Sequence, residues 1–271
     1  MTESVVIDEY VVWLRSWGAS PATIKARREL ALSRIREWGM DGFTVANLQR
    51  YLARDSIRSE WSRATYYSNF KDFCTWAVAA GYMAENPFDS ELLKSPTRPR
   101  SRPRPLSERE VARVEAAAKG NVRLFIMLGL YAGLRASEIA KIRGEDITAE
   151  GIFVMGKGNK AAIIPCHPEI ARAAEKMPSG YWFTRSDGVN PMRAAVVSFE
   201  VTKLFRELGI QGSSHRCRHT YGTRLLRAGV NVRKVQKLMR HETLETTALY
   251  TAIDEEELSA AINLLPPSSA A

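Results

Sequence analysis

Residues 213–223, "SSHRCRHTYGT", place two histidines and two arginines within five consecutive positions. If residues 215 to 228 form a helix, His215, Arg218 and His219 lie on one face of its first turn. The start of a helix already has free backbone N–H groups and a partial positive charge, so added cations are repelled there. A bound phosphate would remove this conflict. The alternative interpretation is a solvated basic helix face that needs no ligand.

Three further segments contain residues that can act on a phosphate ester. Arg135 follows the helix-breaking Gly133 in "AGLRASE", which predicts that a second amphipathic helix starts at this arginine. Lys157 lies in "GKGNK" between two short apolar segments, a pattern that predicts a β-hairpin with the lysine in its turn. His241 and Tyr250 follow, nine residues apart. Taken singly, Lys157 is better explained as a solvent-exposed surface lysine and Tyr250 as a buried core tyrosine.

The composition is that of a globular protein, and its net charge suggests a polyanionic partner. Of the 271 residues 45% are hydrophobic, enough for one large domain or two of ordinary size. Its 39 Lys and Arg against 30 Asp and Glu give a formal charge of +9. We find no membrane-spanning apolar run and no secretory signal, so we expect a cytoplasmic protein without a membrane partner. The three cysteines lie far apart and indicate neither a disulfide framework nor a zinc site.

The charge distribution divides the chain into domains. Residues 1–92 hold 11 basic and 12 acidic side chains, whereas residues 93–105 hold five basic and none acidic. This second segment contains "KSPTRPRSRPRP", residues 94–105, whose repeated prolines exclude a helix and predict an extended linker. Residues 106–271 form the second domain in this interpretation. Its tail, residues 251–271, holds four acidic side chains and none basic, which makes DNA a poor partner for it.

Helix signals predict a four-helix domain in residues 1–92. Ser20 and Pro21 provide the N-cap and first residue of a helix that Gly39 ends. The other helix signals are an opening segment from Ile7 to Trp17 and the N-caps Thr44 and Ser62. Six aromatic residues recur at core spacings, which favours packing over base stacking: Tyr10, Trp13, Trp17, Phe70, Phe73 and Trp76.

Basic side chains in two segments are candidates for DNA contact. One group lies on the second predicted helix: Lys25, Arg27, Arg28 and Arg34. The other lies in the linker: Arg98, Arg100, Arg102 and Arg104. Groove or phosphate contact and simple solvated charge are both compatible with the first group.

The second domain is predicted to be mixed. Helical runs flank Gly133, two short strands flank the "GKGN" turn, and a further helix ends near Met239. The predicted fold class is therefore mainly α with a small β-hairpin or sheet. It combines an N-terminal four-helix domain with a mixed α+β domain.

The candidate residues occur in one order along the chain: Arg135, Lys157, His215, Arg218, His219, His241 and Tyr250. This series resembles the active site of the tyrosine recombinase family, which includes phage integrases and Xer-type recombinases. The segment before the linker is similar to the family's core-type DNA-binding domain. The resemblance implies a site-specific DNA recombinase that cuts and rejoins DNA through a 3′-phosphotyrosyl intermediate, with no metal, ATP or other cofactor.

The resemblance also implies roles for the main residues. Tyr250 would attack the scissile phosphate, and Lys157 would deliver a proton to the departing 5′ oxygen. Arg135 and Arg218 would bind the non-bridging oxygens, a task that suits permanent, planar cations.

Supporting roles follow in the same way. His215 would assist proton transfer, and His241 would hydrogen-bond the phosphate. Glu138 and His219 match supporting positions. Arg240 departs from the family pattern, which usually has glycine before this histidine. If the helix terminus there is left-handed, a non-glycine residue costs about 1 kcal/mol.

The resemblance implies partners as well: double-stranded DNA core attachment sites, a tetramer of this chain on synapsed DNA, and a directionality factor. Because the core-type helices begin almost at the first residue, we expect no separate arm-site-binding domain. In the tail, Leu258, Ile262 and Leu265 form one apolar stripe of a predicted helix. It could dock on its own domain or, as we favour, on a neighbouring protomer.

Two other functions share parts of this pattern. A type IB topoisomerase uses the same chemistry as a monomer, and synapsis-dependent strand exchange would distinguish it. A noncatalytic DNA-binding regulator could use the same fold, and a covalent-adduct assay would distinguish it.

Overall fold

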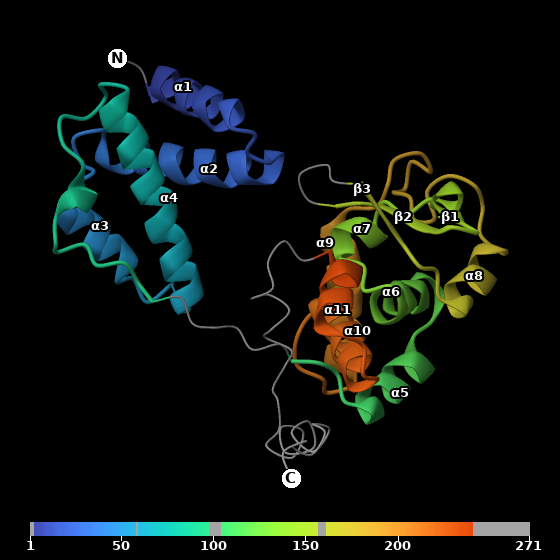
Figure 1. Cartoon of the computed structure of the whole chain (residues 1–271). Helices are drawn as coiled ribbons and strands as arrows, with labels where there is room; N and C mark the ends of the chain where they lie inside the picture. Colours follow the sequence, from blue (N-terminus) through green and yellow to red (C-terminus); the bar gives the residue numbers. More distant parts are fainter. Residues whose placement is uncertain (1–2, 58, 98–103, 157–160, 241–271) are drawn as a thin grey trace, which may run out of the picture. The chain divides into compact units, whose positions relative to one another are not determined.

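The computed structural model describes residues 3–57, 59–97, 104–156 and 161–240. The chain divides into two compact units, Met1–Ser101 and Arg102–Ala271, drawn in Figure 1. Helices dominate both units, and a small sheet lies in the second, as predicted.

The N-terminal unit consists of α-helices and one short 3₁₀ helix. Its elements are α1 (Glu3–Ser16), α2 (Pro21–Trp38), α3 (Val45–Leu52), α4 (Glu60–Ala79) and η1 (Pro87–Asp89). Aromatic rings fill its core: Tyr10 lies edge-on to Phe73 with centroids 5.0 Å apart, and Phe70 is buried beside Tyr51. Trp17, in contrast, remains 51% exposed, so it does not belong to the predicted core.

Local capping signals explain where these helices start. The Ser20 hydroxyl accepts a hydrogen bond from the Thr23 N–H over 3.1 Å, and Thr44 accepts one from Asn47, as predicted. The prediction of Ser62 as the third cap is wrong. Ser59 caps α4 instead, and the Ser62 N–H donates to its hydroxyl over 3.0 Å.

The C-terminal unit contains the remaining elements. They are α5 (Glu108–Ala117), α6 (Gly120–Tyr131), α7 (Ala136–Ile139), η2 (Gly144–Asp146), β1 (Ile147–Thr148), β2 (Gly151–Met155), β3 (Ala161–Ile164), α8 (Pro168–Ala174), α9 (Ala194–Glu207), α10 (His215–Arg227) and α11 (Val232–Met239). The three strands form one antiparallel sheet in the order β1-β2-β3. Ile152 and Val154 of β2 face the core, while Phe153 and Met155 between and after them are exposed.

Helices α6 and α10 pack closely because two glycines permit it. A Cβ atom at Gly129 would lie 2.7 Å from the Cβ of Cys217 on α10. After α6 ends, Gly133 adopts φ +60°, and a Cβ there would lie 2.5 Å from the Tyr221 ring. The turn that precedes Arg135 therefore sits directly on α10, and only glycine satisfies both its backbone and its packing.

Candidate active site

Arg135 lies at the start of α7, directly after the glycine turn. Its backbone N–H donates to Oε2 of Glu138 over 2.8 Å, and its Nη1 donates to Oε1 over 2.8 Å. The Glu138 side chain is 2% exposed, whereas that of Arg135 is 32% exposed. The buried carboxylate therefore anchors an arginine that is still partly accessible to a ligand. A helix does start here, with Arg135 as its N-cap residue, and α7 ends at Ile139.

Arg218 on α10 connects three segments. It is 5% exposed, and its two Nη groups donate to the backbone oxygens of Gly133 and Met239. The first contact ties α10 to the turn before Arg135, and the second ties it to the end of α11. Residues 215, 218 and 219 do share the first part of one helix, as the sequence predicts.

Side-chain hydroxyls do not cap the start of α10, although two serines precede it. Ser214 donates to the Ser198 hydroxyl over 3.2 Å instead. Arg216, the other arginine of residues 213–223, has a structural role. Its guanidinium donates to the backbone oxygens of Arg104 and Pro105, each over 2.9 Å, and pairs with Glu110 at 3.1 Å.

The pKa values of both histidines on α10 are lowered, although His215 is the more exposed of the two. Desolvation, followed by the positive charges of Arg218 and Arg135, lowers the pKa of His215. Burial, followed by His215 and Arg218, lowers the pKa of His219 to about 4. At neutral pH the positive charge of this site therefore resides on arginine, and a neutral imidazole can accept a proton.

Arg240 completes the site from α11. It has φ 54° and ψ 45°, so the helix does end in the left-handed conformation that glycine usually occupies. Its Nη2 donates to Glu138 Oε2 over 2.7 Å. Glu138 thus accepts hydrogen bonds from two arginines that are 105 residues apart along the chain.

We call these residues the arginine cluster: Gly133, Arg135, Glu138, Arg218, Met239 and Arg240. Its contacts close a circuit, because Arg218 joins Gly133 to Met239 while Glu138 joins Arg135 to Arg240. The cluster contains three guanidinium groups but only one carboxylate, which binds two of them. The excess of positive charge gives the cluster the electrostatics of a site for a phosphodiester.

Several predicted site residues lie outside the described residues: Lys157, His241, Tyr250, Arg98, Arg100, Arg102 and the predicted tail helix. Arg104 is described and exposed. The strands that flank Lys157 pair as predicted, with Met155 opposite Ala161. Arg240, which precedes His241, is the last described residue before the segment that contains His241 and Tyr250.

The predicted DNA-contact residues on α2 differ in accessibility. Arg27 pairs with Asp72 at 2.6 Å, and Arg34 pairs with Glu37; both arginine side chains are 14% exposed. Lys25 is 76% exposed and Arg28 is also exposed. Lys25 and Arg28 are therefore better placed for phosphate contact than the two arginines held within this unit.

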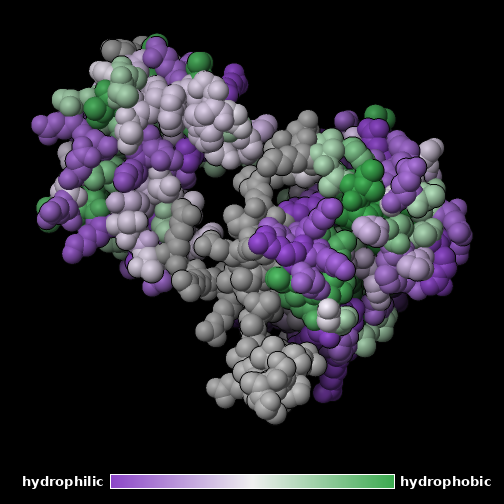
Figure 2. Space-filling model, in the orientation of Figure 1, coloured by the Kyte–Doolittle hydropathy of each residue, from purple (hydrophilic) through white to green (hydrophobic). Residues whose placement is uncertain are grey.

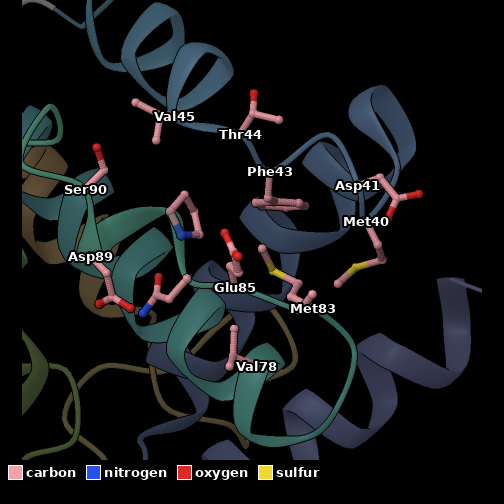
Figure 3. A pocket seen from close by; sticks show the side chains of 13 residues that line it. Met40, Asp41, Phe43, Thr44, Val45, Val78, Met83, Glu85, Asp89 and Ser90 are labelled. Carbon is pink, nitrogen blue, oxygen red and sulfur yellow. The ribbon is translucent and has the colours of Figure 1, made fainter.

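A cavity of about 760 Å³ in the N-terminal unit has a different character. Figure 3 shows Asp41, Glu85 and Asp89 among its lining side chains, with Met40 and Met83 supplying apolar surface. Lysine and arginine are absent from the described residues that line it. Because its charge is negative, this cavity does not suit a phosphate.

Hydrophilic side chains gather over the region of α9 and α11 in the C-terminal unit (Figure 2). On α11 the exposed cations are Arg233, Lys234 and Lys237. Across the described part of the chain, His, Cys, Asp and Glu form no group of three that could hold a metal ion. In that same part, helices long and apolar enough to cross a membrane are absent.

Comparisons with known proteins identify the family of the chain. The model of the phage integrase family matches residues 105–257. The chain belongs to this family. Tyrosine recombinase XerA of Pyrococcus horikoshii is 30% identical over 97% of this chain and 94% of its own length. A tyrosine recombinase of Pseudothermotoga lettingae is 32% identical over 75% of this chain and 74% of its own.

Solved structures agree with this assignment. The integrase from mycobacterium phage Brujita is 32% identical to this chain, with a TM-score of 0.51. The match covers 96% of this chain and 92% of the integrase chain. A lambda integrase bound to a core site has a TM-score of 0.73 at 17% identity, over 92% and 77% of the two chains, and shows the shared fold. The protein is accordingly a tyrosine recombinase, a DNA-binding enzyme that breaks and rejoins DNA during site-specific recombination.

Proposed function

We propose that the arginine cluster is the phosphate-binding site of this recombinase and that Tyr250 supplies the nucleophile. The observation that carries the proposal is the contact circuit in which Glu138 and Arg218 join the start of α7, the first turn of α10 and the end of α11. In it, Arg135 and Arg218 would bind the non-bridging oxygens, whose charge increases in the pentavalent transition state.

The bond changes follow from these assignments. The phenolic oxygen of Tyr250 attacks the scissile phosphorus, so a phosphotyrosyl bond forms at the 3′ side as the bond to the 5′ oxygen breaks. Lys157 gives that oxygen its proton. Neutral His215 accepts or returns the tyrosine proton, and His241 donates to the phosphate. His219 supports the site indirectly, because it lies beside His215 and Arg218. Rejoining reverses the step, so neither ATP nor a metal is required.

DNA binding is proposed for both units. Residues 1–92 would act as the core-type DNA-binding domain through Lys25 and Arg28, and Arg104 belongs to the linker segment, residues 93–105. A lambda integrase has been solved as a tetramer bound to a Holliday junction. We propose the same assembly here, on double-stranded core attachment sites in the cytoplasm, with a directionality factor as a further partner.

Nicked suicide duplexes made from candidate attachment sites test the proposal. When the wild-type protein cleaves such a duplex, the short strand diffuses away, so the covalent complex accumulates and is seen on a denaturing gel. Tyr250→Phe should bind the same duplex but form no complex. Arg135→Lys and Arg218→Lys should lose most cleavage, because lysine lacks the planar two-pronged contact. A complex with Tyr250→Phe would refute the nucleophile assignment.

The same substrates separate the alternative functions. A noncatalytic regulator would give no covalent complex at any site that it binds. A type IB topoisomerase would relax a supercoiled plasmid as a monomer without exchanging strands between two sites. A recombinase exchanges strands only when both sites are present.

A further inference from the structure

Arg240 adopts a strained backbone conformation. Among the described residues it is the one non-glycine residue with positive φ. It follows the last residue of α11, and its N–H donates to the Lys237 oxygen over 3.1 Å to end the helix. Glycine would make the same backbone contact without strain. The side chain must therefore provide what glycine lacks.

The Arg240 side chain is committed to one strong contact. It is 10% exposed, and its Nη2 lies 2.7 Å from Oε2 of Glu138. Its Nη1 lies 3.4 Å from the Leu238 oxygen, a weak contact, and its buried Nε has no hydrogen-bond partner in the described part of the chain. Arg240 thus combines backbone strain with a buried donor that has no partner among the described residues. Both are unfavourable, which indicates that the ion pair with Glu138 has a role.

Glu138 transmits the effect of this pair to Arg135. One of its oxygens binds Arg240, and the other binds Nη1 of Arg135. With a second guanidinium on the carboxylate, less of the Arg135 charge is cancelled by Glu138. The carboxylate is also held from two sides, which fixes the position of the Arg135 guanidinium.

We propose that Arg240 is a positioning residue that acts on Arg135 through Glu138. This inference rests on the proposed function, in which Arg135 binds the scissile phosphate. Arg240 need not touch DNA in this role. It keeps Arg135 in place and leaves its charge available to the transition state.

The test compares Arg240→Gly with wild type in single-turnover cleavage of the nicked duplex that wild type cleaves. A second duplex carries a methylphosphonate at the scissile position, which removes one negative charge and so reduces the need for cations. We expect Arg240→Gly to cleave the phosphate duplex about tenfold more slowly or worse, because small displacements of a positioned group have large effects. Its rate on the methylphosphonate, relative to wild type, should fall much less.

Two further variants complete the design. Lys237→Ala removes an exposed positive charge from the same helix and should leave the ratio of the two rates at the wild-type value. Arg240→Lys keeps the charge and should fall between wild type and Arg240→Gly. If Arg240→Gly does not fold, as judged by thermal unfolding and duplex binding, the two-substrate ratio of Arg240→Lys decides.

Two results would overturn the inference. Arg240→Gly could cleave the phosphate duplex at the wild-type rate, or it could cleave both duplexes more slowly by the same factor, which would indicate that Arg240 only stabilises the fold. Failure of the proposed function looks different. In that case Arg135→Ala would still cleave the phosphate duplex, or wild type would form no covalent complex.

Discussion

The substitution Gly133→Ala should loosen the whole arginine cluster. Two separate penalties apply at this position. The left-handed backbone, φ +60°, costs an alanine about 1 kcal/mol relative to glycine. The new Cβ would also lie 2.5 Å from Cδ1 of Tyr221, and relieving such overpacking costs about 1–3 kcal/mol. We therefore expect a loss of about 2–4 kcal/mol in the stability of the C-terminal unit.

Gly209→Ala is the matched control. Gly209 has φ +68°, close to that of Gly133, but a Cβ there would meet nothing within 4 Å. This variant isolates the backbone term and should lose about 1 kcal/mol. The difference between the two variants then measures how tightly the turn before Arg135 packs on α10.

Hydrogen–deuterium exchange of peptides from α6 and α10 can measure both losses. Each kcal/mol of lost stability should speed exchange about fivefold. Combining Gly133→Ala with Tyr221→Ala should recover part of the loss, a coupling of about 1–3 kcal/mol, because the colliding ring is gone. Equal exchange in Gly133→Ala and Gly209→Ala would refute the packing argument.

Three further predictions concern protons, metals and assembly. His219 has a folded pKa of about 4, below its unfolded value of about 6.5, so the unfolded state binds the proton first and stability should fall as pH drops between these values. His219→Gln should flatten that acid-side decline in a pH series of unfolding measurements, and an unchanged slope would contradict it. Strand exchange should persist in excess EDTA, because guanidinium groups supply the charge neutralisation that Mg²⁺ gives other phosphoryl-transfer enzymes; loss of activity that Mg²⁺ restores would count against this. Deleting residues 255–271 should preserve half-site binding but reduce tetramers and recombination, and native gels with undiminished tetramers would exclude docking of the tail on a neighbour.

Local signals in the sequence predicted the helices well where one residue decides the matter. Ser20 and Gly39 bound α2 as expected, because a cap and a positive-φ stop act within a few residues. The prediction of Ser62 as an N-cap was wrong because Ser59 offers the same hydroxyl three residues earlier, and α4 starts after Ser59.

Distant partners explain what the sequence could not predict. The sequence predicted that a helix starts at Arg135 but did not predict where it ends. In the structure α7 ends at Ile139, and three residues later the Ile142 oxygen accepts a hydrogen bond from the distant Trp182 N–H over 3.0 Å. The pairing of Arg240 with Glu138 could not be predicted either, because 102 residues separate the two partners. The strain at Arg240 could be anticipated from the family resemblance, in which glycine usually precedes this histidine, whereas the contact with Glu138 could not.

The arginine cluster also holds the residue directly before the segment that contains the proposed nucleophile. His241 follows Arg240 directly, and Tyr250 lies nine residues beyond His241. Arg218 holds the Met239 oxygen and Glu138 holds the Arg240 side chain, so the point from which that segment departs is fixed by the groups that flank Arg135. A phosphate bound by Arg135 and Arg218 would therefore lie beside the origin of the nucleophile segment whatever path that segment takes.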